Sequence, residues 1–200
     1  MITTIIFDWG GVIAVGRYRR PIFELISKEK STSIEDKYPD FDELISKINQ
    51  GIMSFKDFLK NLNSRLGLAL TEGRVREIFR QAMILDEKVI DIIKDLHSSY
   101  NLVLLSDNNE ITVNNMKAYR SDMLGLFGKK YFSYELKMLK PDPKLFAFVL
   151  EDLKLSTSEC IFIDDKQNII DAAKQCGING ILFSSADQLK EELRKLKIKI

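Results

Sequence analysis

Residues 5–13, IIFDWGGVI, form an apolar run that is interrupted by one aspartate and a pair of glycines. The β-branched and aromatic residues before Asp8 predict a buried strand, and Gly10 and Gly11 predict a turn directly after it. Asp8 at this strand end has two interpretations. It is either a carboxylate that is solvated or bonded to turn amides, or it is a nucleophile or metal ligand. The choice depends on whether reactive side chains also follow other strands.

Three further apolar runs are typical of buried parallel strands, because they are β-rich and lack polar–apolar alternation. These three runs are NLVLLS (101–106), CIFID (160–164) and GILF (180–183), and the first run is TTIIF (3–7). Helical patterns alternate with them at residues 86–101, 142–153 and 186–196. This alternation predicts an α/β fold with a doubly wound, mostly parallel, Rossmann-like sheet, whose ligands bind at the carboxyl ends of the strands.

The first strand and the helix that begins near Asp86 are separated by about seventy residues with little strand signal, which is too long for an ordinary connection. Within this segment Ser54 and Asp57 have capping-box spacing, an amphipathic stripe follows, and Gly67 ends the pattern. The stretches 21–30, 41–50 and 71–83 predict further helices. We therefore expect a small helical cap at residues 15–83, inserted after the first strand into a core domain of residues 1–14 and 84–200. Arg17–Arg20 is either a solvated turn or a cluster that steers phosphate inward.

The composition limits the classes of partner and of site that we expect. The 200 residues include 30 basic and 29 acidic residues, so the net charge of +1 gives no reason to expect a nucleic-acid or acidic-membrane partner. Two cysteines are too few for a disulfide framework or a zinc ribbon. No leader or membrane-spanning run is evident. We expect a cytoplasmic protein, a monomer or homodimer, that acts on a small molecule.

Three more polar clusters stand at strand ends or in adjoining loops, and each has a plain structural interpretation. Ser106, in LLSDNNE (104–110), is either a helix N-cap or part of a phosphate cradle. Lys140, in KMLKPDP (137–143), is either a solvated loop lysine or a cation that neutralises a phosphate and a carboxylate. Asp164 and Asp165 are either an acidic helix cap or, with Asp8, the oxygen ligands of Mg²⁺. Their shared position at one edge of the sheet favours a single site.

The order of these residues is Asp8, Ser106, Lys140 and then Asp164 with Asp165. This order resembles that of the haloacid dehalogenase-like superfamily over residues 1–14 and about 84–184. The resemblance implies a Mg²⁺-dependent phosphatase that acts on a small phosphorylated metabolite, such as a sugar phosphate. It also implies that Asp8 is the nucleophile and forms an aspartyl-phosphate intermediate.

The resemblance further implies which site residues bind the metal and which bind the phosphoryl group. Mg²⁺ would bind Asp8, the main-chain carbonyl of Gly10, Asp165 and Asp164. Ser106 and the amide of Asp107 would hold phosphoryl oxygens, Lys140 would tie the phosphate to Asp8, and Gly10 and Gly11 would line the substrate-binding turn.

The sequence departs from the usual family pattern at two positions. Gly10 stands where most members have a second aspartate, which protonates the leaving group and later activates water. FDWGGVI resembles a branch with glycine there, which includes sugar-1-phosphate phosphatases and the amino-terminal domains of epoxide hydrolases. Loss of a general acid costs roughly 10²- to 10⁴-fold where the leaving oxygen needs a proton, so we expect sugar-1-phosphates to be preferred over sugar-6-phosphates. Ile169 replaces an acidic or amide residue of many relatives, and Asn168 is the candidate substitute.

Two other functions are alternatives to a phosphatase. A 2-haloacid dehalogenase uses the same nucleophile on carbon without a metal, and the extra negative charge of Asp164 and Asp165 argues against it. A non-catalytic phosphate-binding or regulatory protein would keep the fold and lose turnover with Gly10. Mg²⁺-dependent release of phosphate distinguishes a phosphatase from such a binding protein.

Overall fold

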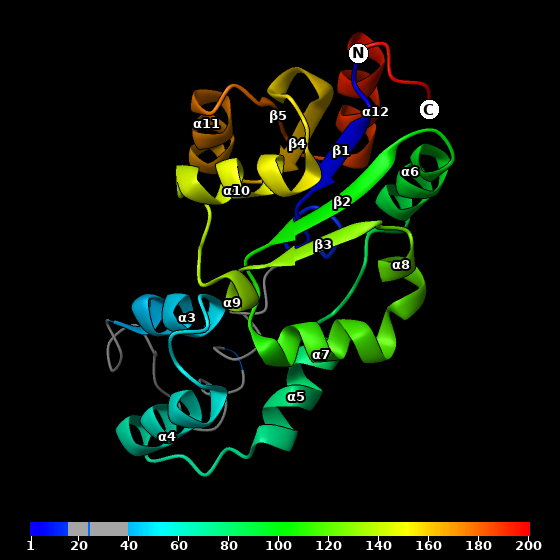
Figure 1. The fold of residues 1–200 in the computed structure, drawn as a ribbon. Coiled ribbons are helices and arrows are strands. Elements are labelled where there is room, and N and C mark those ends of the chain that lie inside the picture. Colours follow the sequence, from blue (N-terminus) through cyan, green and yellow to red (C-terminus); the bar gives the residue numbers. More distant parts are fainter. Residues whose placement is uncertain (16–23, 25–39) are drawn as a thin grey trace.

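The computed structural model describes residues 1–15, 24 and 40–200 (Figure 1). The helix expected at 21–30, apart from Glu24, lies outside the described residues, and so does Arg17–Arg20. None of the described helices combines the length and the apolar character that crossing a membrane requires.

Five parallel strands form one sheet in the order β3-β2-β1-β4-β5. The strands are β1 (Thr4–Phe7), β2 (Asn101–Ser106), β3 (Lys129–Phe132), β4 (Cys160–Asp164) and β5 (Asn179–Leu182). The predicted doubly wound α/β fold is confirmed, and four strands lie within one residue of their predicted positions. The edge strand β3, KKYF, was not predicted, because two lysines in four residues leave no apolar run.

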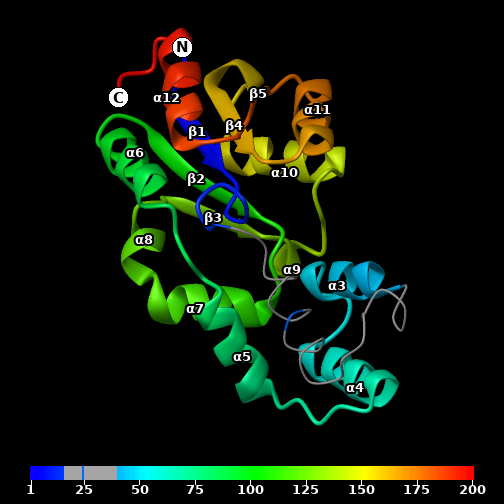
Figure 2. The same ribbon diagram turned by 180° about the vertical axis from the view of Figure 1, so that it is seen from behind.

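Helices cover both faces of the sheet (Figures 1 and 2). Successive side chains of β1 point to opposite faces, so Ile5 and Phe7 enter one core and Ile6 enters the other. The first core includes side chains of α6 (Glu87–His97), α7 (Glu110–Tyr119), α8 (Ser121–Gly125) and α12 (Ala186–Lys195). The second includes side chains of α10 (Pro143–Leu153) and α11 (Gln167–Gln175). Short elements complete the chain, α9 (Ser133–Leu136) and the 3-10 helix Thr157–Glu159.

Three helices of the insertion lie among the described residues, α3 (Phe41–Asn49), α4 (Phe55–Leu66) and α5 (Glu72–Gln81). The boundaries of α4 follow the expected signals, because Ser54 Oγ accepts the Asp57 amide hydrogen at 3.1 Å and Gly67 adopts a left-handed conformation with φ of 60°. The helices share an apolar cluster that includes the fully buried Phe58. Ile111 of α7 also belongs to this cluster, so the insertion packs apart from the two cores of the sheet but in contact with α7.

Side-chain hydrogen bonds attach the insertion to the rest of the molecule. Asn115 of α7 donates to the Arg76 carbonyl of α5 at 2.9 Å. At the end of α3, Asn49 accepts a hydrogen bond from Asn109 at 3.1 Å, and Gln50 donates to the Lys137 carbonyl at 2.9 Å. These contacts hold the carboxyl-terminal end of α3 against loops that follow β2 and α9.

Replacing Phe58 by alanine should lower the free energy of unfolding by about 3–5 kcal/mol, because it removes a fully buried ring from the insertion cluster. Urea unfolding followed by circular dichroism would measure the loss, with the exposed Lys56→Ala change in the same helix as the control. An unchanged midpoint for Phe58→Ala would show that the ring is not packed as described.

Candidate active site

The carboxyl ends of the three central strands bring the predicted residues together. Phe7 is in register with Leu104 of β2 and with Ile163 of β4, so Asp8 follows β1 between the ends of its two neighbours. The amide of Asp8 donates to the Ile163 carbonyl at 2.9 Å, which continues the ladder by one residue. Ser106 and Asp164 are the last residues of β2 and β4, so both lie beside Asp8.

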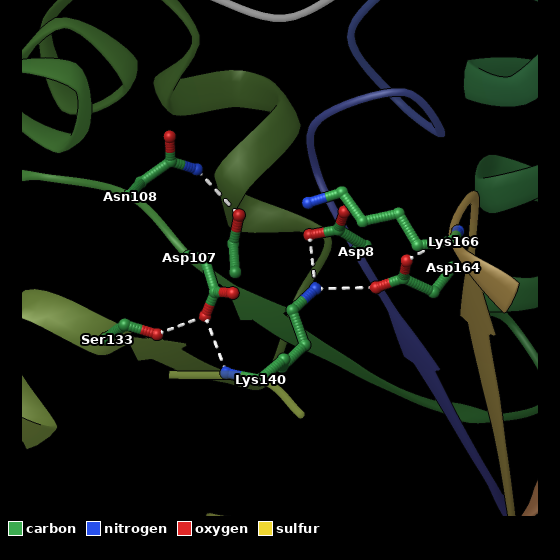
Figure 3. Close-up of polar contacts among 8 residues, drawn as sticks. Asp8, Asp107, Asn108, Ser133, Lys140, Asp164 and Lys166 are labelled. Carbon is green, nitrogen blue, oxygen red and sulfur yellow. Dashed lines mark hydrogen bonds and ion pairs between the residues drawn. The ribbon is translucent and has the colours of Figure 1, made fainter. Parts of the chain in front are cut away.

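Lys140 joins two of these carboxylates (Figure 3). Its Nζ lies 2.8 Å from Asp8 Oδ1 and 2.7 Å from Asp164 Oδ2, and its side chain is only 1% exposed. The interpretation of Lys140 as a solvated loop lysine is therefore wrong. Burial lowers the pKa of the ammonium, but the attraction of Asp8, Asp164 and Asp107 outweighs it and holds the pKa above its usual value. Lys140 is thus a permanent cation inside the site.

Asp107 anchors the loop that carries Lys140. Its Oδ1 accepts the Lys140 amide hydrogen at 3.1 Å and the hydroxyl hydrogen of Ser133. Burial raises the pKa of Asp107, against the lowering influence of Lys140 and Ser133. The sequence implied a role only for the Asp107 amide. The anchoring carboxylate was missed, and so was Ser133, because it begins a short helix after a strand that carried no signal.

The Ser106 hydroxyl is arranged to donate a hydrogen bond. Its Oγ accepts from Asn108 Nδ2 at 2.6 Å, and both residues are buried. With a lone pair engaged, the hydroxyl hydrogen can point toward a ligand oxygen. The N-cap of α7 is Asn109, whose Oδ1 accepts the Thr112 amide hydrogen at 3.1 Å, so the N-cap interpretation of Ser106 is wrong.

Asp8, Asp164 and Asp165 form a cluster that fits a divalent cation. One carboxylate oxygen from each lies within 4.8 Å of the others. Hard oxygen ligands suit Mg²⁺, and the three carboxylates outnumber the lysines at the site, Lys140 and Lys166, so a negative charge remains for a cation to balance. Burial, partly opposed by Lys140, raises the pKa of Asp164 to about 6.

The two glycines after β1 have different surroundings. A Cβ built at Gly10 would meet no heavy atom within 4 Å, and Gly10 lines the site cavity. Gly11 has φ of 84°, and a Cβ there would overlap the Asp165 carboxylate. Gly11 therefore allows the turn to approach Asp165 closely. It is not among the described residues that line the cavity.

A cavity of about 310 Å³ opens at these strand ends. Asp8, Ser106 and Lys140 line it from the sheet side. Asp164 and Asp165 are absent from its described wall, so Asp8 is the member of the carboxylate cluster that lines the cavity. The volume is at the lower end of the range for small-molecule sites.

Helix α3 forms the opposite wall. Asp42, Ser46 and Asn49 line the cavity and follow the spacing of one helical face, whereas the buried apolar residues of α3 enter the insertion cluster. The amphipathic pattern predicted the helix. The sequence did not indicate that its polar face would meet the site, because that depends on how the insertion folds back over the sheet.

The second departure from the family pattern also has a structural outcome. Ile169 is buried in the core between the sheet and α11, and Asn168 is exposed. Neither is among the described cavity residues. Lys166, which the sequence analysis did not consider, does line the cavity.

Residues 2–177 match the haloacid dehalogenase-like hydrolase family, which covers most of the chain. The chain belongs to this family. Solved enzymes of this family that resemble the chain bind magnesium, and the aspartate cluster of this hydrolase fits the same cofactor. The resemblance inferred from the order of the motifs is thereby confirmed.

Relatives extend the comparison along nearly the whole chain. This hydrolase is 28% identical to a D-ribitol-5-phosphate phosphatase of Bacteroides thetaiotaomicron, over 96% of this chain and 97% of that protein. A crystal structure of a family enzyme from the same organism, in complex with magnesium and inorganic phosphate, superimposes with a TM-score of 0.80 at 25% identity and covers 92% of this chain and 95% of its own. A shorter match, 33% identical over 32% of this chain and 12% of the relative, is to bifunctional epoxide hydrolase 2 of Rattus norvegicus. These similarities support a hydrolase of the phosphatase type.

Replacing Lys140 by methionine should destabilise the metal-free protein by about 3–5 kcal/mol at pH 8, because it leaves Asp8 and Asp164 buried without their cation. The loss should be smaller at pH 5. A carboxyl whose folded pKa is raised binds its proton more tightly when folded, so its destabilising effect grows as the pH rises from the unfolded pKa to the folded pKa. The effect is complete above the folded pKa and absent below the unfolded one. Removing Lys140 raises the pKa of Asp164 above about 6 and extends this effect upward.

Urea unfolding with chelator at both pH values would measure this, with the exposed Lys144→Met change as the control. A loss of equal size at pH 5 and pH 8 would contradict the assignment of Lys140 as the cation of two buried carboxylates.

Proposed function

We propose that this hydrolase removes the phosphoryl group from small phosphorylated sugars or sugar alcohols, with Asp8 as the nucleophile. One observation carries the proposal: the buried ammonium of Lys140 contacts both Asp8 and Asp164 in a cavity that the Ser106 hydroxyl also lines. An anionic nucleophile, a fixed cation and a neutral donor at one strand edge are what phosphoryl transfer requires.

The bound Mg²⁺ would neutralise charge on the phosphoryl oxygens, with Asp8, Asp164 and Asp165 as its protein carboxylates and Gly10 as the source of a carbonyl. A carboxylate oxygen of Asp8 forms a bond to phosphorus, while the bond to the leaving oxygen breaks and its electron pair stays on that oxygen. Water then hydrolyses the aspartyl phosphate and restores Asp8. Lys140 orients the Asp8 carboxylate for the attack, because its Nζ lies 2.8 Å from Asp8 Oδ1.

Ser106 and its neighbours would hold the phosphoryl group. The Ser106 hydroxyl donates to one oxygen, since Asn108 already supplies its acceptor contact. The carboxylate of Asp107 acts indirectly in this arrangement, because it fixes the Lys140 loop, and the Asp107 amide would hold a phosphoryl oxygen. The residues that hold Ser106 and the Lys140 loop in place thus come from the end of β2 and from the position after β3.

The substrate class follows from the wall opposite the phosphate site. Asp42, Ser46 and Asn49 present a carboxylate, a hydroxyl and an amide from α3, which can hydrogen-bond the hydroxyls of a sugar or sugar alcohol. The relative named D-ribitol-5-phosphate phosphatase supports a substrate of this kind. Residues 15–83 would then serve as the cap that closes the site and selects the substrate.

Other expectations stay predictions: the domain boundaries, the preference for sugar-1-phosphates, the cytoplasmic location and the monomeric or dimeric state. A metal-free dehalogenase is less well supported, because Asp8, Asp164 and Asp165 bring together three carboxylates where a carboxylated substrate would be repelled. A binding protein without turnover is distinguished by the experiment below.

Phosphate release from a panel of sugar and sugar-alcohol phosphates should require both Mg²⁺ and Asp8. Asp8→Asn should reduce the rate by roughly 10⁴-fold, because the amide cannot form the phosphoryl intermediate. A colorimetric phosphate assay with Mg²⁺ or with chelator measures this, and Asp95→Asn, an exposed change on α6, is the control. Binding of phosphate without release from any member would favour the non-catalytic alternative.

Ser46→Ala should raise KM for the preferred sugar-alcohol phosphate by roughly three- to tenfold, because one hydrogen bond to a substrate hydroxyl is lost. KM for 4-nitrophenyl phosphate, which lacks such hydroxyls, should not change. Steady-state kinetics with both substrates measure the difference. Ser64→Ala, an exposed change in the same insertion, is the matched control. Equal effects on both substrates would remove Ser46 from the substrate-recognising wall.

A further inference from the structure

Lys166 is a second cation at the active-site cavity. Its amide donates to Asp164 Oδ1 at 2.9 Å, so its backbone is fixed directly beside the carboxylate cluster. The half-buried side chain lines the same cavity as Asp8 and Gly10. Figure 3 shows this side chain extending from the side of Asp164 toward Asp8, with its ammonium end beside the Asp8 carboxylate in this view.

The Lys166 ammonium differs from that of Lys140 in its partners. Lys140 Nζ contacts Asp8 and Asp164, and both contacts are shorter than 3 Å. Lys166 forms no ion pair with any carboxylate in the part of the chain that the structure describes, and its hydrogen bonds there all use its backbone amide and carbonyl. A half-buried ammonium that faces a cavity gains most from an anionic partner, and substrate can supply one.

Gly10 leaves room for this partner. No side chain stands there to protonate a leaving group, and a Cβ at Gly10 would meet no heavy atom within 4 Å. Lys140 is held by its two carboxylates, and Ser106 is positioned for the phosphoryl oxygens. Of these donors, Lys166 is the one whose charged end remains available for another oxygen.

We propose that Lys166 stabilises the leaving-group oxygen, a task that position 10 cannot perform in this chain. The inference rests on the proposed phosphatase function and adds a catalytic residue to it. As Asp8 bonds to phosphorus, the electron pair of the breaking bond collects on the leaving oxygen. The ammonium donates a charge-assisted hydrogen bond to that oxygen as the bond breaks. The oxygen then takes a proton from water, and the hydroxide that remains is consumed when the aspartyl phosphate is hydrolysed.

The rate enhancement that Lys166 provides depends on the leaving group. A sugar-alcohol oxygen develops nearly a full negative charge, whereas 4-nitrophenolate disperses its charge over the ring. Removing one preorganised donor from a developing oxyanion costs roughly 10²- to 10³-fold, so Lys166 matters most for alkyl phosphates. A site with Gly10 is then able to accept sugar-alcohol phosphates as well as substrates with good leaving groups.

The test compares Lys166→Met and Lys166→Arg with the unaltered protein on alkyl phosphates and on aryl phosphates of graded leaving-group pKa. Lys166→Met should lose roughly 10²-fold in kcat/KM on the alkyl phosphate and less than about threefold on 4-nitrophenyl phosphate. Lys166→Arg should retain most of the alkyl rate. Lys174→Met, an exposed change on the same helix, controls for loss of charge.

Two further measurements separate this role from others. Affinity for inorganic phosphate, measured by calorimetry, should be unchanged in Lys166→Met, and the same variant should unfold at the same temperature. Adding Gly10→Asp to Lys166→Met should restore part of the alkyl rate, because the open space accepts a side chain that can act on the same oxygen.

An equal loss on all substrates, or no loss on any, would overturn the inference while leaving the phosphatase intact. Weaker binding of inorganic phosphate would also overturn it, since Lys166 would then hold the phosphoryl group. No release by the unaltered protein would overturn the proposed function itself and the inference with it. If Lys166→Met does not fold, Lys166→Gln tests the same loss of charge.

Discussion

The contact of one buried ammonium with two carboxylates organises the site. Asp8 and Asp164 end neighbouring strands, and without a cation between them their charges would repel each other in a region that excludes water. Lys140 supplies that cation from a loop more than 130 residues after Asp8 in the sequence. The strand ends, the loop and the carboxylates therefore depend on one another, and the Asp8 carboxylate is held in place because they meet.

The surroundings of Lys140 show how such a contact is kept in place. Asp107 and Ser133 hold the backbone of its loop, and they come from the end of β2 and the residue after β3. An edge strand with two lysines thus contributes to the site, although its own sequence gave no sign of a strand. It pairs with β2 because the neighbouring strand offers an open edge, which is a property of the assembled sheet.

The insertion supplies the second wall of the cavity. Its helices bury their apolar residues in a separate cluster, and α3 turns a polar face toward Asp8 and Ser106. Asn109 links the two parts, because it caps α7 and also donates to Asn49 at the end of α3. The cavity is consequently lined by the reactive groups of the core on one side and by polar residues of the insertion on the other.

The sequence by itself determined the parallel α/β fold, four of its strands, the caps of α4 and the grouping of Asp8, Ser106, Lys140, Asp164 and Asp165. These follow from local patterns, because apolar runs, capping residues and strand ends are set by neighbouring residues. Only the tertiary structure decided that Lys140 is buried, that Asp107 anchors its loop, and that Ser46 and Lys166 line the cavity. Those facts depend on which surfaces meet across the sheet edge, and a local pattern carries no record of contacts between residues so far apart in the chain.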